Sequence, residues 1–159
     1  MSNNKLKILI PIVSICIIYF IFLMSSDSYS DVRTLRFSET AYNLISNEIQ
    51  SILKEKGIDT KTIDLVIRKS AHFIEYMILS MVLYKISLAY KIKQKAYIIY
   101  ILFICLLIAN LDEFYQSFVA GRNSEVRDCL IDFLGSITGI LIYLSLRRLY
   151  KTKNKRTKA

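Results

Sequence analysis

Two groups of charged and hydrogen-bonding residues stand beside otherwise apolar stretches of this chain. In chain order they are Lys69, His72, Glu75 and Tyr76, and then Asp112, Glu113, Gln116, Arg122, Asp128 and Asp132. An ionisable side chain near the middle of a bilayer costs roughly 2.5–3.5 kcal/mol on insertion scales, so such residues are rarely kept among apolar helices without a role. Their types predict either a site for a ligand or a network of ion pairs that fixes helix packing.

Four of these residues are of types that perform acid–base chemistry. His72 and Glu75 can share proton transfer, and Asp112 with Glu113 supplies a second pair of carboxyl groups. These four are the candidate catalytic residues. The chain has no Gly-x-Ser-x-Gly motif that would supply a nucleophile. Catalytic turnover and binding without turnover therefore both stay open.

The other polar residues are predicted to hold the ligand. Arg122 carries a fork of donors that matches a phosphate or carboxylate group, and Asp128 can orient that fork. The full set of predicted ligand contacts is Lys69, Tyr76, Gln116, Arg122, Asp128 and Asp132. This chemistry suits the headgroup of a membrane lipid or a lipid-linked cell-wall precursor.

The same residues have two other interpretations. In the structural one, ion pairs join Lys69 or Arg68 to Glu75, and Arg122 to Asp112 or Asp128, and their loss would destabilise the fold without touching chemistry. In the other, His72 and the carboxylates hold a metal ion. A single histidine is a poor set for zinc, which favours several His or Cys ligands, so no metal site is predicted.

The composition indicates an integral membrane protein. Of 159 residues, 53% are hydrophobic, and there are only one proline and four glycines. With their polar ends included, four apolar runs are long enough to cross a bilayer as helices: Ile8–Met24, Tyr76–Ala89, Tyr97–Leu111 and Leu130–Leu146. The predicted fold is all-α, with four membrane-spanning helices.

The first apolar run has a second interpretation as a cleaved signal peptide, because Lys5 and Lys7 precede it. Its length exceeds that of most signal sequences, and the residues after Met24 lack a clear small-x-small cleavage site. We expect a retained anchor.

Basic residues predict the orientation of the chain in the cell membrane. Lysines precede the first run, further lysines lie between the second and third, and a basic tail follows the fourth. Lys and Arg collect on the cytoplasmic side, so both termini are predicted to be cytoplasmic. The formal net charge of +9 is then mostly a tail beside anionic lipid, and no nucleic-acid partner is expected. The polar groups would meet at the outer boundary of the membrane.

Helical spacing gathers the polar residues onto single faces. Arg68, His72 and Glu75 follow an i, i+4, i+7 pattern, so they project from one side of a helix. Gly135 and Gly139 have the small-x-x-x-small spacing that lets another helix approach closely.

The long connection between the first two apolar runs contains an amphipathic pattern. Apolar residues recur at helical spacing from Phe37 to Leu53, Ser38 is a candidate cap, and Gly57 marks an end. We expect one helix that either lies on the outer leaflet or covers the polar cluster as a lid. Asp59 and Thr60 can cap a further helix that runs into the second span.

The polar motifs resemble those of the VanZ-like membrane protein family. They read Lys69-x-x-His72-Phe73-x-Glu75-Tyr76, then Asp112-Glu113-x-x-Gln116-x-Phe118, then Gly121-Arg122, and then Asp128-x-x-x-Asp132-x-x-Gly135-x-x-x-Gly139. Asp132 departs from the pattern, because Asn is expected to be frequent there.

The apolar runs, the charges and this resemblance, which covers about residues 66 to 146, divide the chain into four parts, and the resemblance implies a function. The parts are 1–24 (cytoplasmic flank and first span), 25–65 (extracytoplasmic loop), 66–147 (core with three spans) and 148–159 (basic tail). The family's name-giving member is associated with raised resistance to the lipoglycopeptide teicoplanin. The resemblance brings no established reaction and no cofactor. A non-catalytic structural protein and a small transporter that uses the intramembrane carboxylates remain the alternatives.

Overall fold

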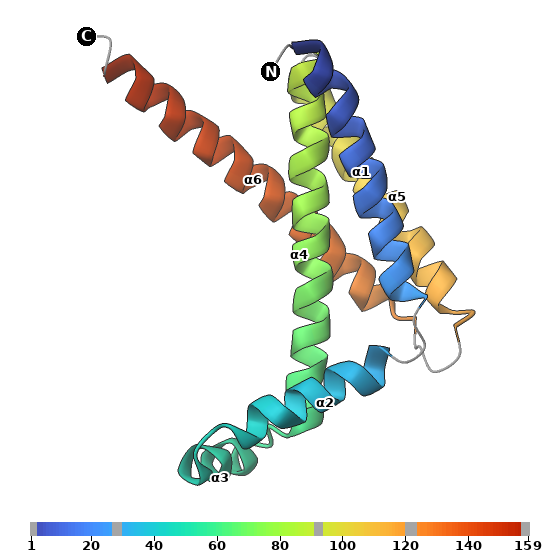
Figure 1. Cartoon of the computed structure of the whole chain (residues 1–159), viewed down its shortest axis with the longest axis vertical. Helices are drawn as coiled ribbons and strands as arrows, with labels where there is room; N and C mark the ends of the chain where they lie inside the picture. Colours follow the sequence, from blue (N-terminus) through green and yellow to red (C-terminus); the bar gives the residue numbers. More distant parts are fainter. Residues whose placement is uncertain (1–2, 27–29, 91–93, 120–123, 157–159) are drawn as a thin grey trace.

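The chain is a bundle of long helices with two short helices at one end (Figure 1). The computed structural model describes residues 3–26, 30–90, 94–119 and 124–156. Within these ranges there are no strands. The helices are α1 (Asn3–Ser25), α2 (Ser30–Asn43), α3 (Asn47–Glu55), α4 (Thr60–Ala89), α5 (Gln94–Gln116) and α6 (Val126–Arg156). The predicted all-α fold is confirmed.

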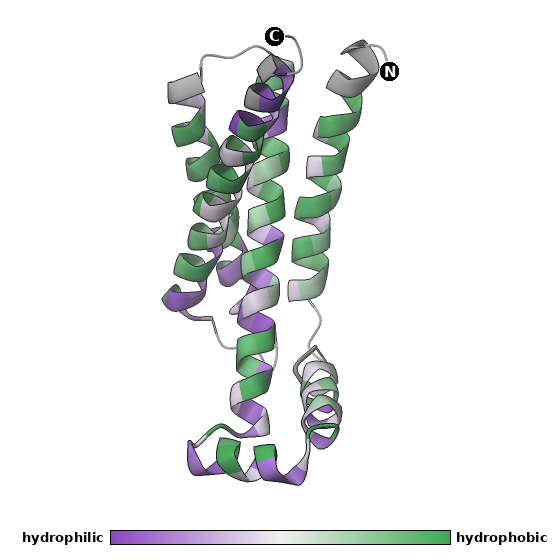
Figure 2. Cartoon of the chain, turned by 90° about the vertical axis from the view of Figure 1, so that its left-hand side faces the viewer, coloured by the Kyte–Doolittle hydropathy of each residue, from purple (hydrophilic) through white to green (hydrophobic). Residues whose placement is uncertain are grey.

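Four helices, α1, α4, α5 and α6, are long and apolar enough to cross a membrane. Figure 2 shows hydrophobic residues along most of each helix, with hydrophilic residues toward the end that carries α2 and α3 and again on the last turns of α6 at the opposite end. The described start of α1 and end of α6 both lie at the opposite end of the bundle (Figures 1 and 2). This arrangement agrees with an even number of spans.

The second apolar run and the helix predicted before it form one continuous helix, as expected. The helix α4 begins at Thr60, ahead of the apolar run that starts at Tyr76, and its 30 residues are about 45 Å long at 1.5 Å per residue. The cap predicted at Asp59 is confirmed, because its Oδ1 accepts hydrogen bonds from the Thr62 backbone N–H at 2.8 Å and the Thr62 hydroxyl at 2.7 Å. The polar residues of α4 therefore lie in the middle of a helix rather than at its start.

The helix α4 forms the centre of the structure and packs against α1, α2, α5 and α6. Its closest approach to α6 uses the two glycines of the predicted packing motif. A Cβ atom at Gly135 would fall on the carbonyl oxygen of Phe73, and one at Gly139 would fall on the carbonyl oxygen of Met77. The glycines therefore let the two backbones cross in contact, as their spacing predicted.

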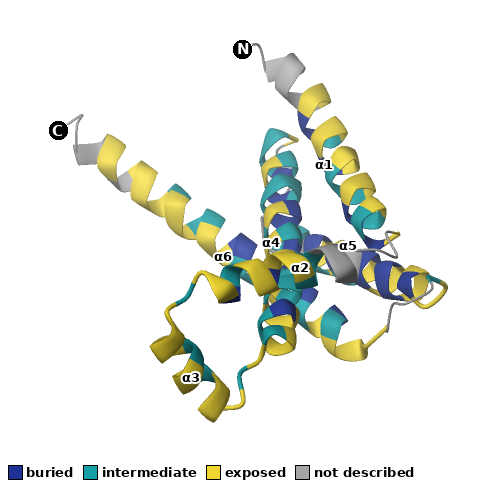
Figure 3. Cartoon of the chain, turned by 60° about the horizontal axis from the view of Figure 1, so that its bottom comes forward, coloured by how far each residue is buried: buried dark blue, intermediate teal, exposed yellow. Residues whose placement is uncertain are grey.

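The apolar core lies where α1, α4, α5 and α6 meet. Its buried members are Ile21, Tyr76, Leu79, Tyr84, Ile101, Cys105, Ile108, Ala109 and Ile140. Figure 3 shows that the C-terminal half of α6 and most of α3 are exposed, whereas α4 and α5 are buried on the faces that point into the bundle.

The prediction of a single loop helix was wrong. The connection instead forms two helices, α2 and α3, which break between Leu44 and Ser46. The side-chain amide of Gln50 donates to the carbonyl oxygens of Tyr42 at 3.1 Å and Ile45 at 2.8 Å, and so satisfies backbone groups that the break leaves open. Ser38 is no cap, because it is buried inside α2 and its hydroxyl donates to the carbonyl of Thr34.

The end predicted at Gly57 is confirmed. Gly57 has a φ of +73°, its N–H donates to Lys54, and the N–H of Ile58 donates to Leu53. This is the Schellman arrangement that closes helices at a residue in the left-handed region, where glycine has no Cβ to strain.

Candidate functional site

The predicted polar groups come together at one level of the bundle. They lie in the middle of α4, in the last two turns of α5 and in the first two turns of α6. The side-chain amide of Gln116 donates to Asp112 at 2.9 Å and to the hydroxyl of Ser25 at 3.1 Å, so the end of α1 lies at this level too. Asp112 is four residues from the end of α5, and is thus about 6 Å into the span.

An ion pair joins α4 to the beginning of α6. The Nζ of Lys69 contacts the Oδ1 of Asp128 and lies 3.9 Å from the Oε2 of Glu125. The alternative in which Lys69 pairs with Glu75 is therefore wrong. Six residues apart on a helix, the two side chains leave on different faces. Arg68 pairs with Asp64, one turn earlier, at 3.1 Å.

Glu113 holds the connection between α5 and α6. Its Oε2 accepts a hydrogen bond from the backbone N–H of Glu125 at 2.9 Å, just before α6 begins. A carboxylate is favourable there because the first N–H groups of a helix have no partner within the helix and carry partial positive charge. Of the four candidate catalytic residues, Glu113 therefore makes a hydrogen bond that helps to fix the start of α6.

The innermost part of the cluster is sealed from solvent. Tyr76, Asp112 and Asp132 are essentially fully buried. In the part of the chain that the structure describes, neither carboxylate oxygen of Asp132 nor the Tyr76 hydroxyl has a hydrogen-bond partner. Among the described residues, the Nδ1 of His72 lies 3.9 Å from the Oδ1 of Asp132, which is too long for a hydrogen bond.

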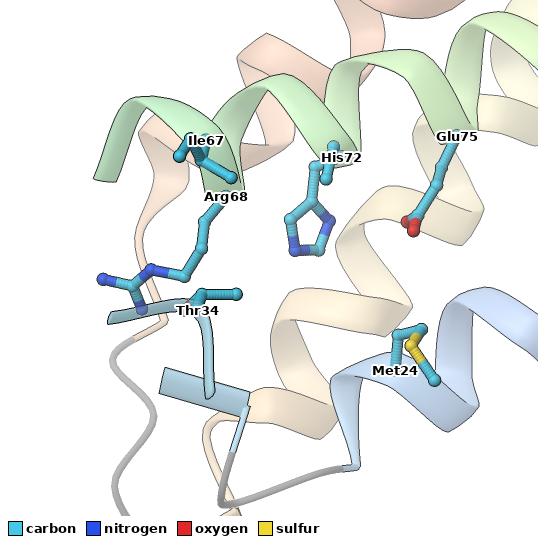
Figure 4. Close-up of a pocket in the computed structure, with 7 residues that line it drawn as sticks. Met24, Thr34, Ile67, Arg68, His72 and Glu75 are labelled. Atoms are coloured by element: carbon cyan, nitrogen blue, oxygen red, sulfur yellow. The ribbon is translucent and has the colours of Figure 1, made fainter. Parts of the chain in front are cut away.

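A pocket lies on another face of α4, beside this cluster (Figure 4). Its volume is about 140 Å³, and its lining is Met24, Thr34, Ile67, Arg68, Ala71, His72 and Glu75. Figure 4 shows Arg68, His72 and Glu75 projecting in sequence from α4 into the same space, with Thr34 of α2 and Met24 of α1 opposite. His72 belongs to both the pocket and the cluster, because its ring also approaches Asp132.

The sequence predicted part of this pocket. The i, i+4, i+7 spacing placed Arg68, His72 and Glu75 on one face, although Arg68 was considered only as an ion-pair partner. No sequence signal pointed to Thr34 or Met24, since both are brought to the pocket by how α1 and α2 pack on α4.

Arg122, the expected anion clamp, lies outside the described residues. Within the described ranges, no three His, Cys, Asp or Glu side chains are grouped so that they could hold a metal ion.

Comparison with known proteins identifies the family. No curated protein and no solved structure gives a significant match to the chain. The profile of the VanZ/LLP1 family matches residues 11–148, which include all four apolar helices apart from their outer ends, the pocket and every residue of the polar cluster. On this match over most of its length, the chain belongs to the VanZ/LLP1 family.

Proposed function

We propose that this protein binds the headgroup of a membrane lipid or of a lipid-linked cell-wall precursor at the outer face of the cell membrane. Through that binding it would contribute to teicoplanin resistance, by altering how the lipoglycopeptide meets its target. The resistance part of the proposal comes from the resemblance to the VanZ-like family.

The pocket is the observation that carries the proposal. Arg68 and His72 are residue types that bind phosphate or carboxylate groups, and they line a cavity beside apolar side chains. The pocket lies near the level where α1 and α5 end, as the contact between Gln116 and Ser25 indicates. A lipid bound in a bilayer presents its headgroup near that level.

The basic residues support an outward-facing pocket. Both described chain ends lie at the end of the bundle opposite α2 and α3, and the C-terminal part of α6 is rich in Lys and Arg. The pocket is lined in part by α2. Because Lys and Arg favour the cytoplasmic side, the pocket end is assigned to the outside.

Susceptibility of a sensitive Gram-positive host tests the proposal. Cells expressing the wild type, Arg68→Gln, His72→Gln or Glu75→Gln would be compared for growth in teicoplanin and in vancomycin, with membrane abundance measured for each. Wild type is expected to protect against teicoplanin with little effect on vancomycin, and the pocket variants are expected to lose protection at normal abundance. Protection that survives all three substitutions would contradict the proposal.

A structural function is favoured for a defined subset of the polar residues. Lys69, Asp128 and Glu113 make contacts that join α4 to α6 and fix the start of α6. Replacing them is expected to lower membrane abundance, whereas replacing the pocket residues is expected to lower protection alone.

A further inference from the structure

We infer that the pocket selects a zwitterionic headgroup, namely a phosphoryl group joined by a short linker to a primary amine. This inference rests on the proposed function, because it names the class of headgroup that the same pocket would bind. Phosphatidylethanolamine is a membrane lipid of this class.

The first argument is the order of charges along the pocket. Arg68 and Glu75 are seven residues apart on α4, which separates their backbone positions by about 10 Å along the helix. Figure 4 shows the Arg68 guanidinium at one end of the lining, the Glu75 carboxylate at the other, and His72 between them. A ligand that lies along α4 thus meets a cationic end and an anionic end, the complement of a phosphate followed by an ammonium group.

The second argument is the chemistry of the groups. Arg68 can donate two hydrogen bonds to a phosphoryl group, and its Nε is already directed by Asp64 at 3.1 Å. A carboxylate such as Glu75 accepts hydrogen bonds and repels a second anion, so it disfavours headgroups that carry only negative charge. Arg68 attracts the phosphate of either kind of lipid, whereas Glu75 attracts an ammonium group and repels a second negative charge. Together they favour zwitterionic over anionic lipids.

The third argument is size. A cavity of roughly 150 Å³ holds benzene, so a pocket of this volume holds a group of about six non-hydrogen atoms. A phosphoethanolamine unit is only slightly larger and can extend through the mouth of the pocket toward the glycerol backbone. A choline headgroup carries three methyl groups on nitrogen in place of three protons, so it is bulkier and cannot donate hydrogen bonds to the Glu75 carboxylate. The pocket therefore favours a primary amine.

Lipid retention by the purified full-length protein tests this inference. The protein would be equilibrated in detergent with an equimolar mixture of phosphatidylethanolamine, phosphatidylcholine and phosphatidylglycerol with matched chains, and bound lipid would be measured by native mass spectrometry. We expect the wild type to retain phosphatidylethanolamine over each of the others by on the order of tenfold, the size of effect that one well-placed charge pair gives.

Substitutions at the two ends of the pocket test which residue produces the preference for a headgroup. Glu75→Gln should reduce retained phosphatidylethanolamine to the level of phosphatidylglycerol, and Arg68→Gln should reduce retention of all three lipids. Glu55→Gln, which changes an exposed carboxylate on α3, should leave the pattern unchanged. A wild type without headgroup preference, or a Glu75→Gln variant that keeps it, would overturn the inference.

A competition experiment with the wild type avoids any effect of substitution on folding. Soluble O-phosphoethanolamine should displace bound lipid at lower concentration than inorganic phosphate or phosphocholine. Equal potency of the three would overturn selection for an amine but leave lipid binding intact. If the wild type retains none of the three lipids while the pocket variants still lose teicoplanin protection, the zwitterion inference fails and the pocket's role in resistance stands. If protection also survives those substitutions, the proposed function fails as well.

Discussion

At the scale of single residues, the polar side chains divide into two kinds that residue type alone does not distinguish. Lys69 and Asp128 pair with each other across two helices, whereas Arg68, His72 and Glu75 line a pocket. All five are ionisable residues on helices that also carry apolar faces, so each looked equally suited to a site or to an ion pair. For the four residues on α4, the division depends on which face of the helix each one occupies and on which element packs against that face.

Asp132 tests whether the buried cluster is held by an ion pair. Its carboxylate has no hydrogen bond to any described residue, so Asp132→Asn removes no hydrogen bond and keeps nearly the same volume. We expect the free energy of unfolding in detergent to change by less than about 1 kcal/mol. The measurement is denaturant-induced unfolding followed by circular dichroism.

A large effect of this substitution would contradict that account. Breaking a buried ion pair costs about 3–5 kcal/mol, so a loss of that size would mean that the 3.9 Å approach of His72 to Asp132 is a true ion pair. Asp132→Ala is the control for lost volume and is expected to destabilise more than Asp132→Asn.

Asp59 gives the start of α4 a dependence on pH. Hydrogen bonds from the Thr62 hydroxyl and N–H hold the pKa of the Asp59 carboxyl below its usual value. Because the folded-state pKa is depressed, the cap's contribution is complete above the unfolded-state pKa, about 3.9, and is lost as the pH falls through the folded-state value. The protection factor of the Thr62 amide, which corrects the exchange rate for its intrinsic dependence on pH, is therefore expected to fall in Asp59→Ala at neutral pH, and in the wild type only in acid.

Asp59→Asn is the matched control for this cap. Asn also accepts a hydrogen bond at a helix N-cap but does not titrate, so the Thr62 amide should stay protected and its protection factor should be independent of pH in this range. Rapid exchange in the Asn variant at neutral pH would show that the charge, and not the hydrogen bond, holds the first turn.

At the scale of elements, predictions from periodicity succeeded where one helix carries its own signals. The Asp59 cap and the Gly57 end are local, and both were predicted. The break between α2 and α3 was missed because it depends on Gln50, whose side chain reaches back to Tyr42 and Ile45 across the turn. When the apolar repeat continues across such a break, the sequence pattern is the same as that of one continuous helix.

The crossing of α4 and α6 depends on Gly135. An added Cβ there would lie 3.1 Å from the carbonyl carbon and 3.2 Å from the Cα of Phe73, and backbone atoms cannot move aside as a flexible side chain can. We expect Gly135→Ala to destabilise the protein by about 1–3 kcal/mol, the usual cost of overpacking. Thermal unfolding in detergent measures this effect.

Ser145→Ala is the control, because it adds no atoms at an exposed position of the same helix. Its midpoint of unfolding should match the wild type. A Gly135→Ala variant as stable as the wild type would show that α4 and α6 are not held in contact at this crossing.

At the scale of the whole molecule, the four-span architecture followed from composition and run length, because apolar helices of that length have few alternatives in a membrane protein. The complete pocket could not be predicted from the sequence. It needs α1 and α2, which lie far from α4 in the sequence, to pack against the middle of α4. No helical period within α4 carries that information.

The proposed orientation of the bundle predicts which residues a reagent outside the cell can reach. In a chain whose native cysteines are replaced by alanine, Ser51→Cys on α3 should react in intact cells with a membrane-impermeant maleimide. Lys153→Cys near the end of α6 should react only after the cells are permeabilised. The reverse pattern would place the pocket in the cytoplasm and contradict the proposed function.

The most direct test of the central claim is to block the pocket after the protein has folded. In the same cysteine-free background, Thr34→Cys places a thiol in the pocket lining, and Ser51→Cys places one on the exposed surface of α3. Lipid retained by each purified protein would be measured by native mass spectrometry before and after reaction with a bulky maleimide. The account predicts that modification of Thr34→Cys releases the bound lipid while modification of Ser51→Cys does not; full retention by the modified Thr34→Cys protein would contradict it.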